Sequence, residues 1–409
     1  MNILLIDRAL PSSVFSGKPV RFRYIYGQLA KEMNITYLRT AQAGEENESE
    51  ELEEWARVTF KNCLRMPPLP KPVLINRLRT IVSLRPWYDL YGKYPDQLED
   101  IFNELSRIIQ AHEIDLVVTF DSEVAQYGLL ASRICPWIQD ACDSMVLQVR
   151  RQAAKASSFS KKSALWLRAV RETKLEREMT RLARETIYVA EDDATMYRSE
   201  KNISVEVIPN GVDTDYFDPS CVNQIKSANP FVVFTGHMSF VPNQDAVCFF
   251  AKEILPVIRN FFPNLEFKIV GADPTAKVYA LTKIKGVEVT GRVPDVRPYL
   301  AGARAFVCSM RMGSGIKNKL LEAMAMKLPI VATSLALKGI EDFPRDAVVQ
   351  TDGIHAFANT LTEVLNTRRQ GDDLGEQARS FVQNGYSWER ALIRYRYLFE
   401  STVEVFSCK

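Results

Sequence analysis

Short apolar runs rich in β-branched residues alternate with helical patterns along the chain, and this alternation constrains the fold more than any other feature of the sequence. In the first half, the apolar runs predict strands at 2–7, 34–39, 114–120, 137–142 and 185–190. Helical spacing is found between them, at 20–32, 95–112, 122–133 and 163–183. Strands that alternate with helices are typical of parallel α/β layers.

The second half repeats the alternation. The predicted strands are 231–236, 266–271, 287–291, 304–309, 329–334 and 347–350. The predicted helices are 244–259, 316–327, 354–366 and 373–383. Between the halves, "VEVIPNGVDTDYFDP" (205–219) breaks the pattern with Pro-Asn-Gly and predicts a connector. An amphipathic helix is predicted to end the chain, with Ser387 as its N-cap and Glu389 in its first turn.

The length of 409 residues is too great for one ordinary core and suits two domains of about 200 residues each. We therefore predict an α/β protein with two tandem doubly wound domains, 1–205 and 206–386, followed by a C-terminal helix over 387–409. Parallel α/β sheets bind ligands at the carboxyl ends of their strands, so a ligand is expected in the cleft between the domains.

Composition excludes several classes of protein. A net charge of +2 argues against a dedicated nucleic-acid-binding protein. The seven cysteines are scattered without a C-x-x-C pair and only three histidines occur, so free thiols and no metal site are expected. The apolar start of the chain is too short for a signal peptide, and no run has the length of a membrane span. A cytoplasmic location is expected.

The stretch "RMGSGIKNKLLEAMAMKLPIVAT" (311–333) is the strongest candidate for chemistry. Its Gly-Ser-Gly turn opens a helix, and backbone N–H groups at such a helix start form an anion site. Lys317 and Lys319 add positive charge that favours a phosphate or diphosphate, and Glu322 could accept hydrogen bonds from sugar hydroxyls. The same residues also fit an ordinary buried helix face with a Lys319–Glu322 surface ion pair.

These residues resemble the donor-site segment of the group 1 nucleotide-sugar glycosyltransferases of GT-B fold. The stretches 207–217, 234–247 and 287–315 are similar to that family's interdomain connector, first donor-domain strand and base-binding region, in the same order and spacing. The resemblance covers nearly all of 205–403 through specific motifs and covers 1–200 only in layout. The motif sequences are most similar to those of a subgroup often associated with bacterial exopolysaccharide synthesis.

The resemblance implies two Rossmann-like domains that face a central cleft, with the C-terminal helix packing back toward the N-terminal, acceptor-binding domain. It implies retaining transfer of a sugar from a nucleoside-diphosphate sugar, without a metal or another cofactor, to a sugar or lipid-linked acceptor. Lys317 and Lys319 would stabilise the leaving diphosphate. The donor-binding residues implied are Gly17, Gly236, His237, Asn243, Arg292, Val293, Arg311, Gly313, Ser314, Gly315, Ile316 and Glu322.

Two departures from the family pattern bear on the donor. Ser314 stands where the motif has its first glutamate, and that acid usually contacts the donor sugar. The family also carries an Arg and a Lys after the first donor-domain strand, where this chain has His237, Ser239 and Asn243. Phosphate binding is therefore expected to shift onto Lys317 and Lys319, and the donor sugar is left open.

In the first domain, a basic cluster follows the first predicted strand. Lys18, Arg21 and Arg23 would either face the cleft, near the diphosphate or the acceptor, or form a solvated helix start. Asp140 and Asp143 lie at the end of the strand 137–142. Family members often have a His or Asp that approaches the transferred sugar here, and we favour Asp143 as the catalytic carboxylate over Asp140. The alternative is an aspartate that caps the next helix.

Two stretches, 61–85 and 150–184, are basic and carry aliphatic and aromatic side chains. They predict either an anionic membrane surface, which a lipid-linked acceptor would favour, or solvated helix faces. The protein would then be peripheral on the inner face of the cytoplasmic membrane. Two other functions stay open on this fold: a nucleotide-sugar 2-epimerase and a non-catalytic nucleotide-sugar-binding protein.

Overall fold

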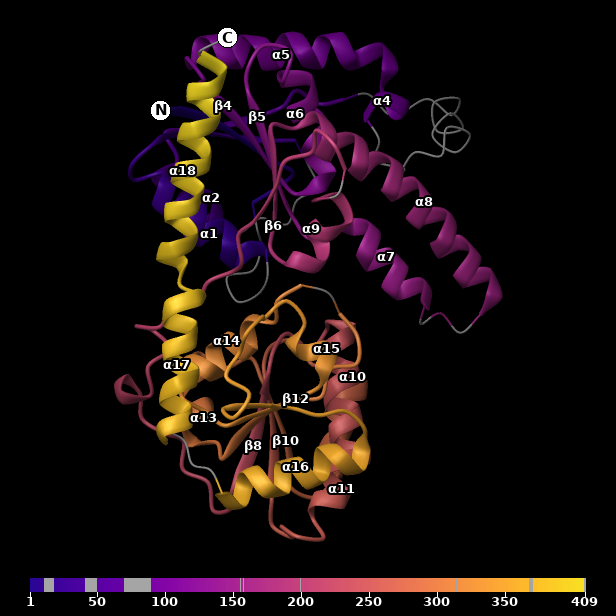
Figure 1. The fold of residues 1–409 in the computed structure, drawn as a ribbon, viewed down its shortest axis with the longest axis vertical. Helices are drawn as coiled ribbons and strands as arrows, with labels where there is room; N and C mark the ends of the chain where they lie inside the picture. Colours follow the sequence, from indigo (N-terminus) through magenta and orange to yellow (C-terminus); the bar gives the residue numbers. More distant parts are fainter. Residues whose placement is uncertain are drawn as a thin grey trace. The chain divides into compact units, whose positions relative to one another are not determined.

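The computed structural model describes residues 1–10, 18–40, 50–69, 90–154, 156, 158–198, 200–313, 315–367 and 371–407. The chain forms two compact units (Figure 1). The first unit comprises Met1–Pro209 and Ala391–Lys409, and the second comprises Asn210–Arg390. Each unit is an α/β domain built on a parallel sheet, which confirms the predicted fold class.

The described residues of the first unit contain a seven-stranded sheet in the order β3-β2-β1-β4-β5-β6-β7. Its strands are β1 Asn2–Asp7, β2 Asn34–Arg39, β3 Asn62–Arg65, β4 Leu116–Phe120, β5 Trp137–Cys142, β6 Glu185–Tyr188 and β7 Val205–Val207. Every neighbouring pair is parallel. Strands β1, β4 and β5 are almost entirely buried because helices cover both faces of the sheet, and β1 and β4 are mostly apolar for this reason.

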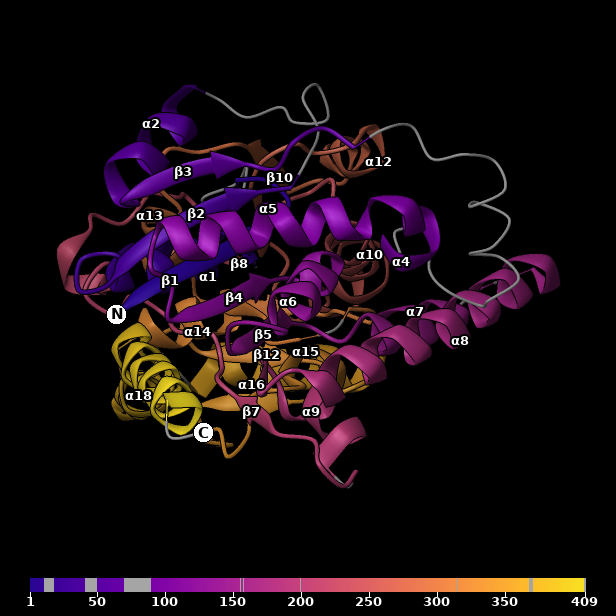
Figure 2. The same cartoon turned by 90° about the horizontal axis from the view of Figure 1, so that it is seen from above.

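Helices surround this sheet, and their bounds follow. They are α1 Lys18–Leu29, α2 Glu50–Thr59, α4 Leu90–Lys93, α5 Leu98–Ala111, α6 Ala125–Ala131, α7 Met145–Ala154, α8 Phe159–Leu182, α9 Glu191–Arg198 and the part of α18 (Trp388–Ser407) from Ala391 onward. Helices α7 and α8 lie side by side and extend away from the sheet as a hairpin (Figures 1 and 2).

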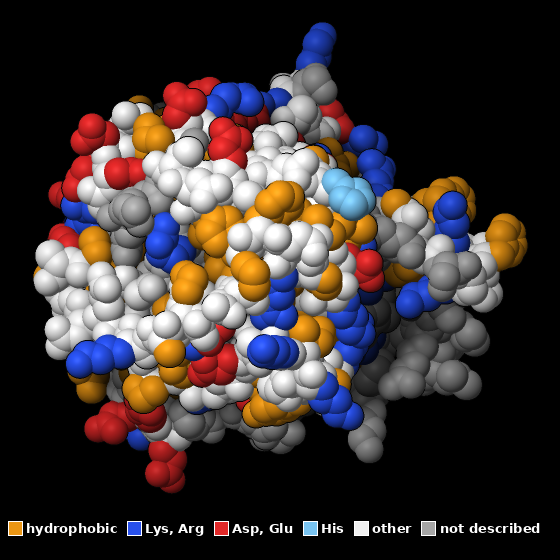
Figure 3. Space-filling view, turned by 90° about the horizontal axis from the view of Figure 1, so that it is seen from below, with side chains coloured by type: hydrophobic (Ala, Val, Ile, Leu, Met, Phe, Trp, Pro, Cys, Tyr) orange, Lys and Arg blue, Asp and Glu red, His pale blue; other side chains and the backbone are white. Residues whose placement is uncertain are grey.

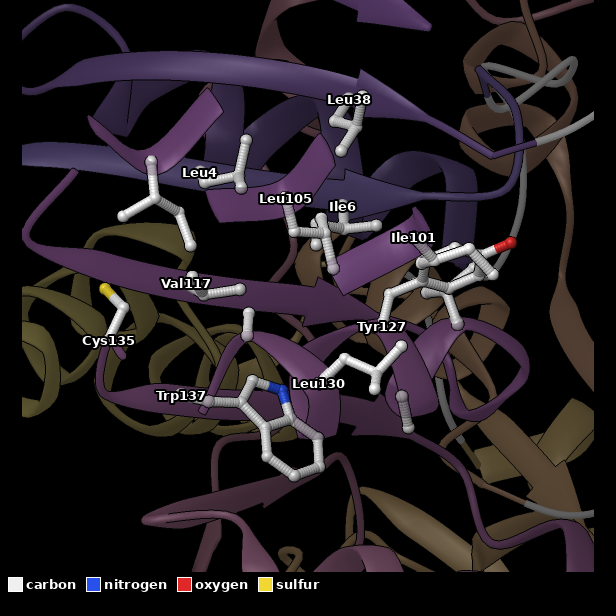
Figure 4. Close-up of a cluster of buried hydrophobic side chains, with 14 of the residues drawn as sticks. Leu4, Ile6, Leu38, Ile101, Leu105, Val117, Tyr127, Leu130, Cys135 and Trp137 are labelled. Atoms are coloured by element: carbon white, nitrogen blue, oxygen red, sulfur yellow. The ribbon is translucent and has the colours of Figure 1, made fainter. Parts of the chain in front are cut away.

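One face of the sheet packs against α5 and α6 (Figure 4). Leu4 and Val117 of the sheet and Leu105 of α5 are completely buried in this layer. Trp137 is buried in the same layer and donates a hydrogen bond from Nε1 to Thr119 Oγ1 at 2.9 Å. Gly128 of α6 leaves room for the indole, because a Cβ atom there would lie 2.1 Å from Trp137 Nε1.

The opposite face packs against α1 and α18. Phe22 and Tyr26 of α1 contact Phe120 with ring centroids 5.1 and 5.7 Å apart, and Tyr26 also contacts Tyr395 of α18. The predicted return of the C-terminal helix to the first domain is therefore confirmed. Its predicted N-cap is confirmed as well, since Ser387 Oγ accepts a hydrogen bond from the Arg390 N–H at 3.3 Å.

The described residues of the second unit contain a six-stranded parallel sheet in the order β10-β9-β8-β11-β12-β13. Its strands are β8 Phe231–Thr235, β9 Glu266–Val270, β10 Val287–Gly291, β11 Ala305–Cys308, β12 Ile330–Ala332 and β13 Val348–Gln350. Its helices are α10 Val241–Phe249, α11 Leu255–Ile258, α12 Ala276–Tyr279, α13 Arg297–Gly302, α14 Asn318–Ala325, α15 Ser334–Leu337, α16 Ile354–Thr367 and α17 Asp373–Gly385.

The structure corrects the sequence prediction in several places. The single helix expected at 244–259 is interrupted by a π-helical turn at Phe250–Ile254. Pro256 lies just beyond that turn and has no N–H to continue the α-helical pattern, which explains the interruption. The sequence pattern did not predict the short strands β3 and β7 or the helices α2, α4, α7, α9, α12 and α15.

Two further observations concern surfaces. Among the residues that the structure describes, no helix is long and apolar enough to cross a membrane. The face of the second unit that lies lowest in Figure 1 carries hydrophobic side chains scattered among polar and basic ones (Figure 3). Scattered hydrophobic side chains of this kind are normal on a protein surface.

Candidate functional site

The candidate site in the second unit begins at the two glycines that immediately follow β8 and β9. Gly236 and Gly271 have φ angles of 153° and 150°, in the region that favours glycine. A Cβ atom on Gly271 would lie 1.8 Å from the Gly236 carbonyl oxygen, so the two strand ends are in close contact. Gly313 and Gly315 also have positive φ, at 122° and 64°, and shape the turn before α14.

Lys319, in the first turn of α14, lies against the end of β8. Its Nζ donates a hydrogen bond to Asn243 Oδ1 at 2.7 Å and lies 4.0 Å from the centroid of the Phe234 ring. Asn243 Nδ2 donates in turn to the His237 carbonyl oxygen at 2.8 Å. Gly236 permits this arrangement, because a Cβ atom there would lie 2.7 Å from Lys319 Nζ.

The charges around Lys319 are poorly solvated. Burial lowers the pKa of Lys319 to about 8, although the neighbouring Cys308 and Glu322 act in the opposite direction. Lys317 is 7% exposed, and its Nζ donates to the Gly315 carbonyl oxygen at 2.5 Å. Two ammonium groups held in such a site favour an anionic ligand, because an anion replaces the water that they have lost.

Glu322 follows Lys319 on the same helix. Burial raises the pKa of Glu322 to about 7, and the positive charge of Lys319 counteracts that rise. The two residues, both in the described part of the chain, do not form the surface ion pair that was the alternative interpretation, since Lys319 Nζ is bonded to Asn243. That interpretation also predicted an ordinary buried helix face, and five of the eight residues of α14 are indeed buried.

A second polar chain runs along the loops after β8 and β9. His237 Nδ1 lies 2.8 Å from Ser239 Oγ, and its Nε2 lies 2.8 Å from Asp273 Oδ2. Arg292, in the loop after β10, approaches the same Asp273 carboxylate at 3.8 Å. Asp273 was missed by sequence reasoning, although its place two residues after the glycine that follows β9 could have indicated it.

The remaining donor-side predictions fall in different places. Arg311 donates to both oxygens of Asp245 at 3.0 and 2.6 Å, and its guanidinium lies 4.1 Å from the centroid of the Phe249 ring on α10. Ile316 is buried under α14, and Val293 lies half-buried in the loop after β10. The predicted residues Gly17 and Ser314 lie outside the described residues.

In the first unit, Lys18 and Asp121 meet at the carboxyl edge of the sheet. Lys18 Nζ lies 2.5 Å from Asp121 Oδ2. Burial opposes the charge on Lys18, but the carboxylates of Asp121 and Asp143 outweigh it and raise the lysine's pKa above its ordinary value. Sequence reasoning missed Asp121. Its φ of 80° and its hydrogen bond from the Ser122 N–H mark a tight turn immediately after β4.

Asp143 follows β5 after Cys142, whose φ of 61° turns the chain out of the sheet. The structure assigns the start of α7 to other side chains. Ser144 Oγ accepts from the Leu147 N–H at 3.2 Å, and Glu176 Oε2 accepts from the Val146 N–H at 3.2 Å. The alternative that Asp143 caps this helix therefore has no hydrogen bond among the described residues to support it.

Arg21 and Asp140 occupy the interior of the first unit. Arg21 is completely buried, lies 3.7 Å from Asp140 Oδ1, and donates to Tyr395 Oη at 2.6 Å and to the Ile208 carbonyl at 2.9 Å. Asp140 Oδ2 accepts from Tyr26 and Tyr395 at 2.8 and 2.5 Å. These contacts fix α18 to the sheet, and they favour a structural role over the predicted contact with an acceptor.

Arg23, the third basic residue predicted on the acceptor side, lies on α1. Its guanidinium is 4.7 Å from the centroid of the Trp55 ring on α2, and the residue is half-buried. Among the residues that the structure describes, there is no group of three His, Cys, Asp or Glu side chains that could hold a metal ion.

Comparison with known proteins connects this geometry to a family. Residues 229–367, which form most of the second unit, match the model of the family described as glycosyl transferases group 1. No curated protein has a matching sequence.

Solved structures resemble the chain over its whole length. A sucrose-phosphate synthase from Thermosynechococcus elongatus has a TM-score of 0.67 at 15% identity, with 100% of both chains covered. Anabaena Alr3699/HepE in complex with UDP has a TM-score of 0.66 at 14% identity and covers 98% of this chain and 100% of its own. A glycosyltransferase from Rickettsia africae ESF-5 has a TM-score of 0.65 at 14% identity, with 98% of each chain covered. These likenesses confirm the GT-B fold, and the family match supports a group 1 glycosyltransferase.

Proposed function

We propose that this chain is a retaining group 1 glycosyltransferase that moves a sugar from a nucleoside-diphosphate sugar to a sugar or lipid-linked acceptor in cell-surface or exopolysaccharide synthesis. The observation that carries the proposal is the position of Lys319, whose partly buried ammonium lies at the glycine-lined end of β8 and bonds to Asn243. A fixed, poorly solvated cation at the carboxyl edge of a parallel sheet suits a diphosphate.

The proposed chemistry is stabilisation of a leaving group. As the bond between the anomeric carbon and the diphosphate breaks, negative charge grows on the departing oxygen. Lys319 and Lys317 are already held in place, so they stabilise that charge without reorganising. Transfer would need no metal ion if the two lysines supply the positive charge. We therefore expect EDTA to leave turnover unchanged.

The nucleobase and ribose are proposed to lie along the same edge of the second unit. Arg292 and Val293, in the loop after β10, would contact the base, and the Glu322 carboxylate would accept hydrogen bonds from the ribose hydroxyls. Structures of the Anabaena neighbour hold UDP or UDP-glucose, which makes uridine diphosphate the first nucleotide to test.

In the first unit we propose Asp143 as the carboxylate that acts on the transferred sugar or the acceptor. Its support is its place immediately beyond β5, at the edge of the sheet where α/β proteins bind ligands. Asp193 of α9 lies close by, since its Oδ1 accepts a hydrogen bond from the Ser144 N–H at 3.2 Å, and burial together with the Asp143 charge raises the pKa of Asp193 to about 7.

The test is a binding screen followed by a turnover assay. UDP, GDP, ADP and dTDP and their glucose derivatives are compared by thermal shift, and release of the diphosphate is then measured with and without lipid and sugar acceptors. Lys319→Ala should lose binding and turnover, whereas the matched control Lys285→Ala changes an exposed lysine outside the site and should lose neither. Retention of the anomeric configuration is read from the product by NMR.

The outcomes separate the alternatives. Acceptor-dependent release of a nucleoside diphosphate supports a transferase. A change in the sugar at C2 without an acceptor would identify an epimerase. Tight nucleotide-sugar binding without turnover on any acceptor would identify a binding protein and refute the proposal.

A further inference from the structure

We propose that the tip of the α7–α8 hairpin docks on an anionic lipid bilayer, with Phe159 and Trp166 entering the interface and Lys161 and Lys162 contacting lipid headgroups. Docking would bring the enzyme to a lipid-linked acceptor, and in this respect the proposal rests on the proposed function. The docking itself needs no catalysis and is measured separately.

The first observation is exposure of large apolar side chains at one end of the hairpin. Phe159 is 88% exposed, Trp166 is 66% exposed and Leu167 is 36% exposed. The buried residues of α8 begin only at Ala169. The first ten residues of this helix therefore project beyond the part that packs on the first unit, as the free end of the hairpin shows (Figures 1 and 2).

The second observation is the helical position of the two aromatic residues. Phe159 and Trp166 are seven residues apart, so they lie on the same face of α8, and Lys162 lies between them. Leu165 lies one turn before Ala169 and so continues the packed face instead. Trp166 borders the packed face, since Ala169 follows three residues later, but both aromatic side chains are exposed because α8 has no buried residue before Ala169.

The third observation is charge. Residues 158–171 contain no Asp or Glu, while Lys161, Lys162 and Arg168 are all exposed. The nearest carboxylate, Glu172, is buried and lies 3.4 Å from Arg168. Arg168 is therefore paired, whereas Lys161 and Lys162 lie on a stretch without acids beside Phe159 and Trp166. Exposed aromatic side chains beside such lysines are typical of helices that lie in the interface of an anionic membrane.

A bilayer explains this surface better than a nucleic acid does. A nucleic acid would use the basic side chains and could stack on one aromatic ring. It would gain little from two aromatic residues a full two turns apart together with Leu167. A bilayer accommodates Phe159 and Trp166 at one depth, because they share a face of α8, and attracts the lysines to its surface potential. The other basic stretch, 61–85, lies outside the described residues from residue 70 onward.

The experiment measures binding of the full chain to vesicles. Vesicles of phosphatidylglycerol mixed with phosphatidylcholine are compared with phosphatidylcholine alone in co-sedimentation at low and high salt. Phe159→Ala/Trp166→Ala should weaken binding at least about tenfold. Lys161→Gln/Lys162→Gln should weaken it roughly 10- to 30-fold at low salt, from about 1 kcal/mol per basic residue.

Matched controls lie in the second unit. Phe261→Ala removes an aromatic side chain that is 61% exposed, and Lys283→Gln/Lys285→Gln removes two exposed lysines. Neither control should change vesicle binding. Brominated acyl chains give a direct readout, because they quench a tryptophan that enters the bilayer. Quenching should occur in the natural protein and disappear in Trp166→Phe.

Each result decides the matter. Anionic-vesicle binding that the hairpin variants lose and the controls keep supports the proposal. Equal binding to neutral vesicles, unchanged binding of the hairpin variants, or binding to RNA in place of vesicles would overturn it. UDP binding is measured on the same variants, and a hairpin variant that binds UDP normally is folded in its second unit. Failure of docking is thereby distinguished from failure of the proposed donor site.

Discussion

Lys319 Nζ lies 2.7 Å from Asn243 Oδ1, and a Cβ atom on Gly236 would approach the same nitrogen to 2.7 Å. Lys319 therefore lies against the end of β8, where any residue other than glycine at position 236 would collide with its ammonium group. An ammonium has three N–H donors, and the bond to Asn243 uses one of them. The other two N–H donors give the Lys319 ammonium its capacity to bind phosphate oxygens. Four predictions concern this site and the first unit.

The first prediction concerns the Lys319 charge. Lys319→Met should weaken UDP binding about 10- to 100-fold, because a hydrogen bond to a charged group contributes roughly 1.5–3 kcal/mol. Isothermal titration measures the change. Lys285→Met serves as the control, since this lysine is exposed and lies outside the site. Equal affinity in the two variants would remove Lys319 from the donor site.

The second prediction concerns pH. The pKa of Lys319 is lowered to about 8, so the free protein loses this positive charge as pH rises through about 8. UDP-glucose affinity should fall over the same range. Glu322 raises the pKa of Lys319, so Glu322→Gln should move the fall to lower pH.

Arginine provides the control for the pH experiment. Lys319→Arg keeps its charge well above pH 8, so its affinity should show no alkaline fall. Titrations at a series of pH values compare the natural protein with both variants. The same fall in Lys319→Arg would assign the titration to another group.

The third prediction concerns the buried contacts of Arg21 with Asp140 and Tyr395. Arg21→Met should lower the free energy of unfolding by about 3–5 kcal/mol, because it leaves the Asp140 carboxylate buried without its cation. Arg23→Met is the matched control on the same helix and should cost less, since its guanidinium contacts the Trp55 ring and, among the residues that the structure describes, pairs with no buried acid. Denaturant unfolding measures both. Arg21→Met/Asp140→Leu should recover part of the loss, and a further loss would contradict this account.

The fourth prediction concerns Asp143. Asp143→Asn should lower turnover about 10²- to 10⁴-fold, the usual contribution of a group that transfers protons or stabilises charge at the reacting centre. Donor affinity and melting temperature should stay unchanged, because Ser144 and Glu176 secure the start of α7. Ser144→Ala is the contrasting variant and should cost about 1 kcal/mol of stability through loss of the cap. A lower melting temperature in Asp143→Asn would indicate a structural aspartate instead.

The sequence predicts the central strands well because burial on both faces leaves continuous apolar runs. Strand β1 has the predicted bounds for this reason. Strand β5 has them as well, although it carries the buried polar residues Gln139 and Asp140. Helix α7 escapes prediction because its start is secured by Ser144 together with carboxylates from α8 and α9, contacts that exist only after the chain has folded. Strand β3 is short and lies at a sheet edge, so its residues carry little apolar pattern.

The candidate site is predictable where glycine and lysine occur together. The Gly-Ser-Gly-Ile-Lys-Asn-Lys order indicates Lys319 directly, whereas Asp121 and Asp273 look like ordinary turn residues in the sequence. Arg21 and Asp140 show the opposite problem. Arg21 lies in the first turn of α1 and Asp140 lies within β5, and only the packing of α18 reveals that they form an ion pair inside the unit.

The contact between Gly236 and Gly271 has a consequence for protein engineering. Any side chain at position 271 would collide with the carbonyl of Gly236. The backbone conformations of the loops that follow β8 and β9 therefore depend on each other. The His237–Asp273 contact joins the same two loops through their side chains. A loop graft intended to change the preferred nucleotide should therefore replace both loops together and retain both glycines. A single grafted loop would lack the contacts with the other loop that fix its conformation.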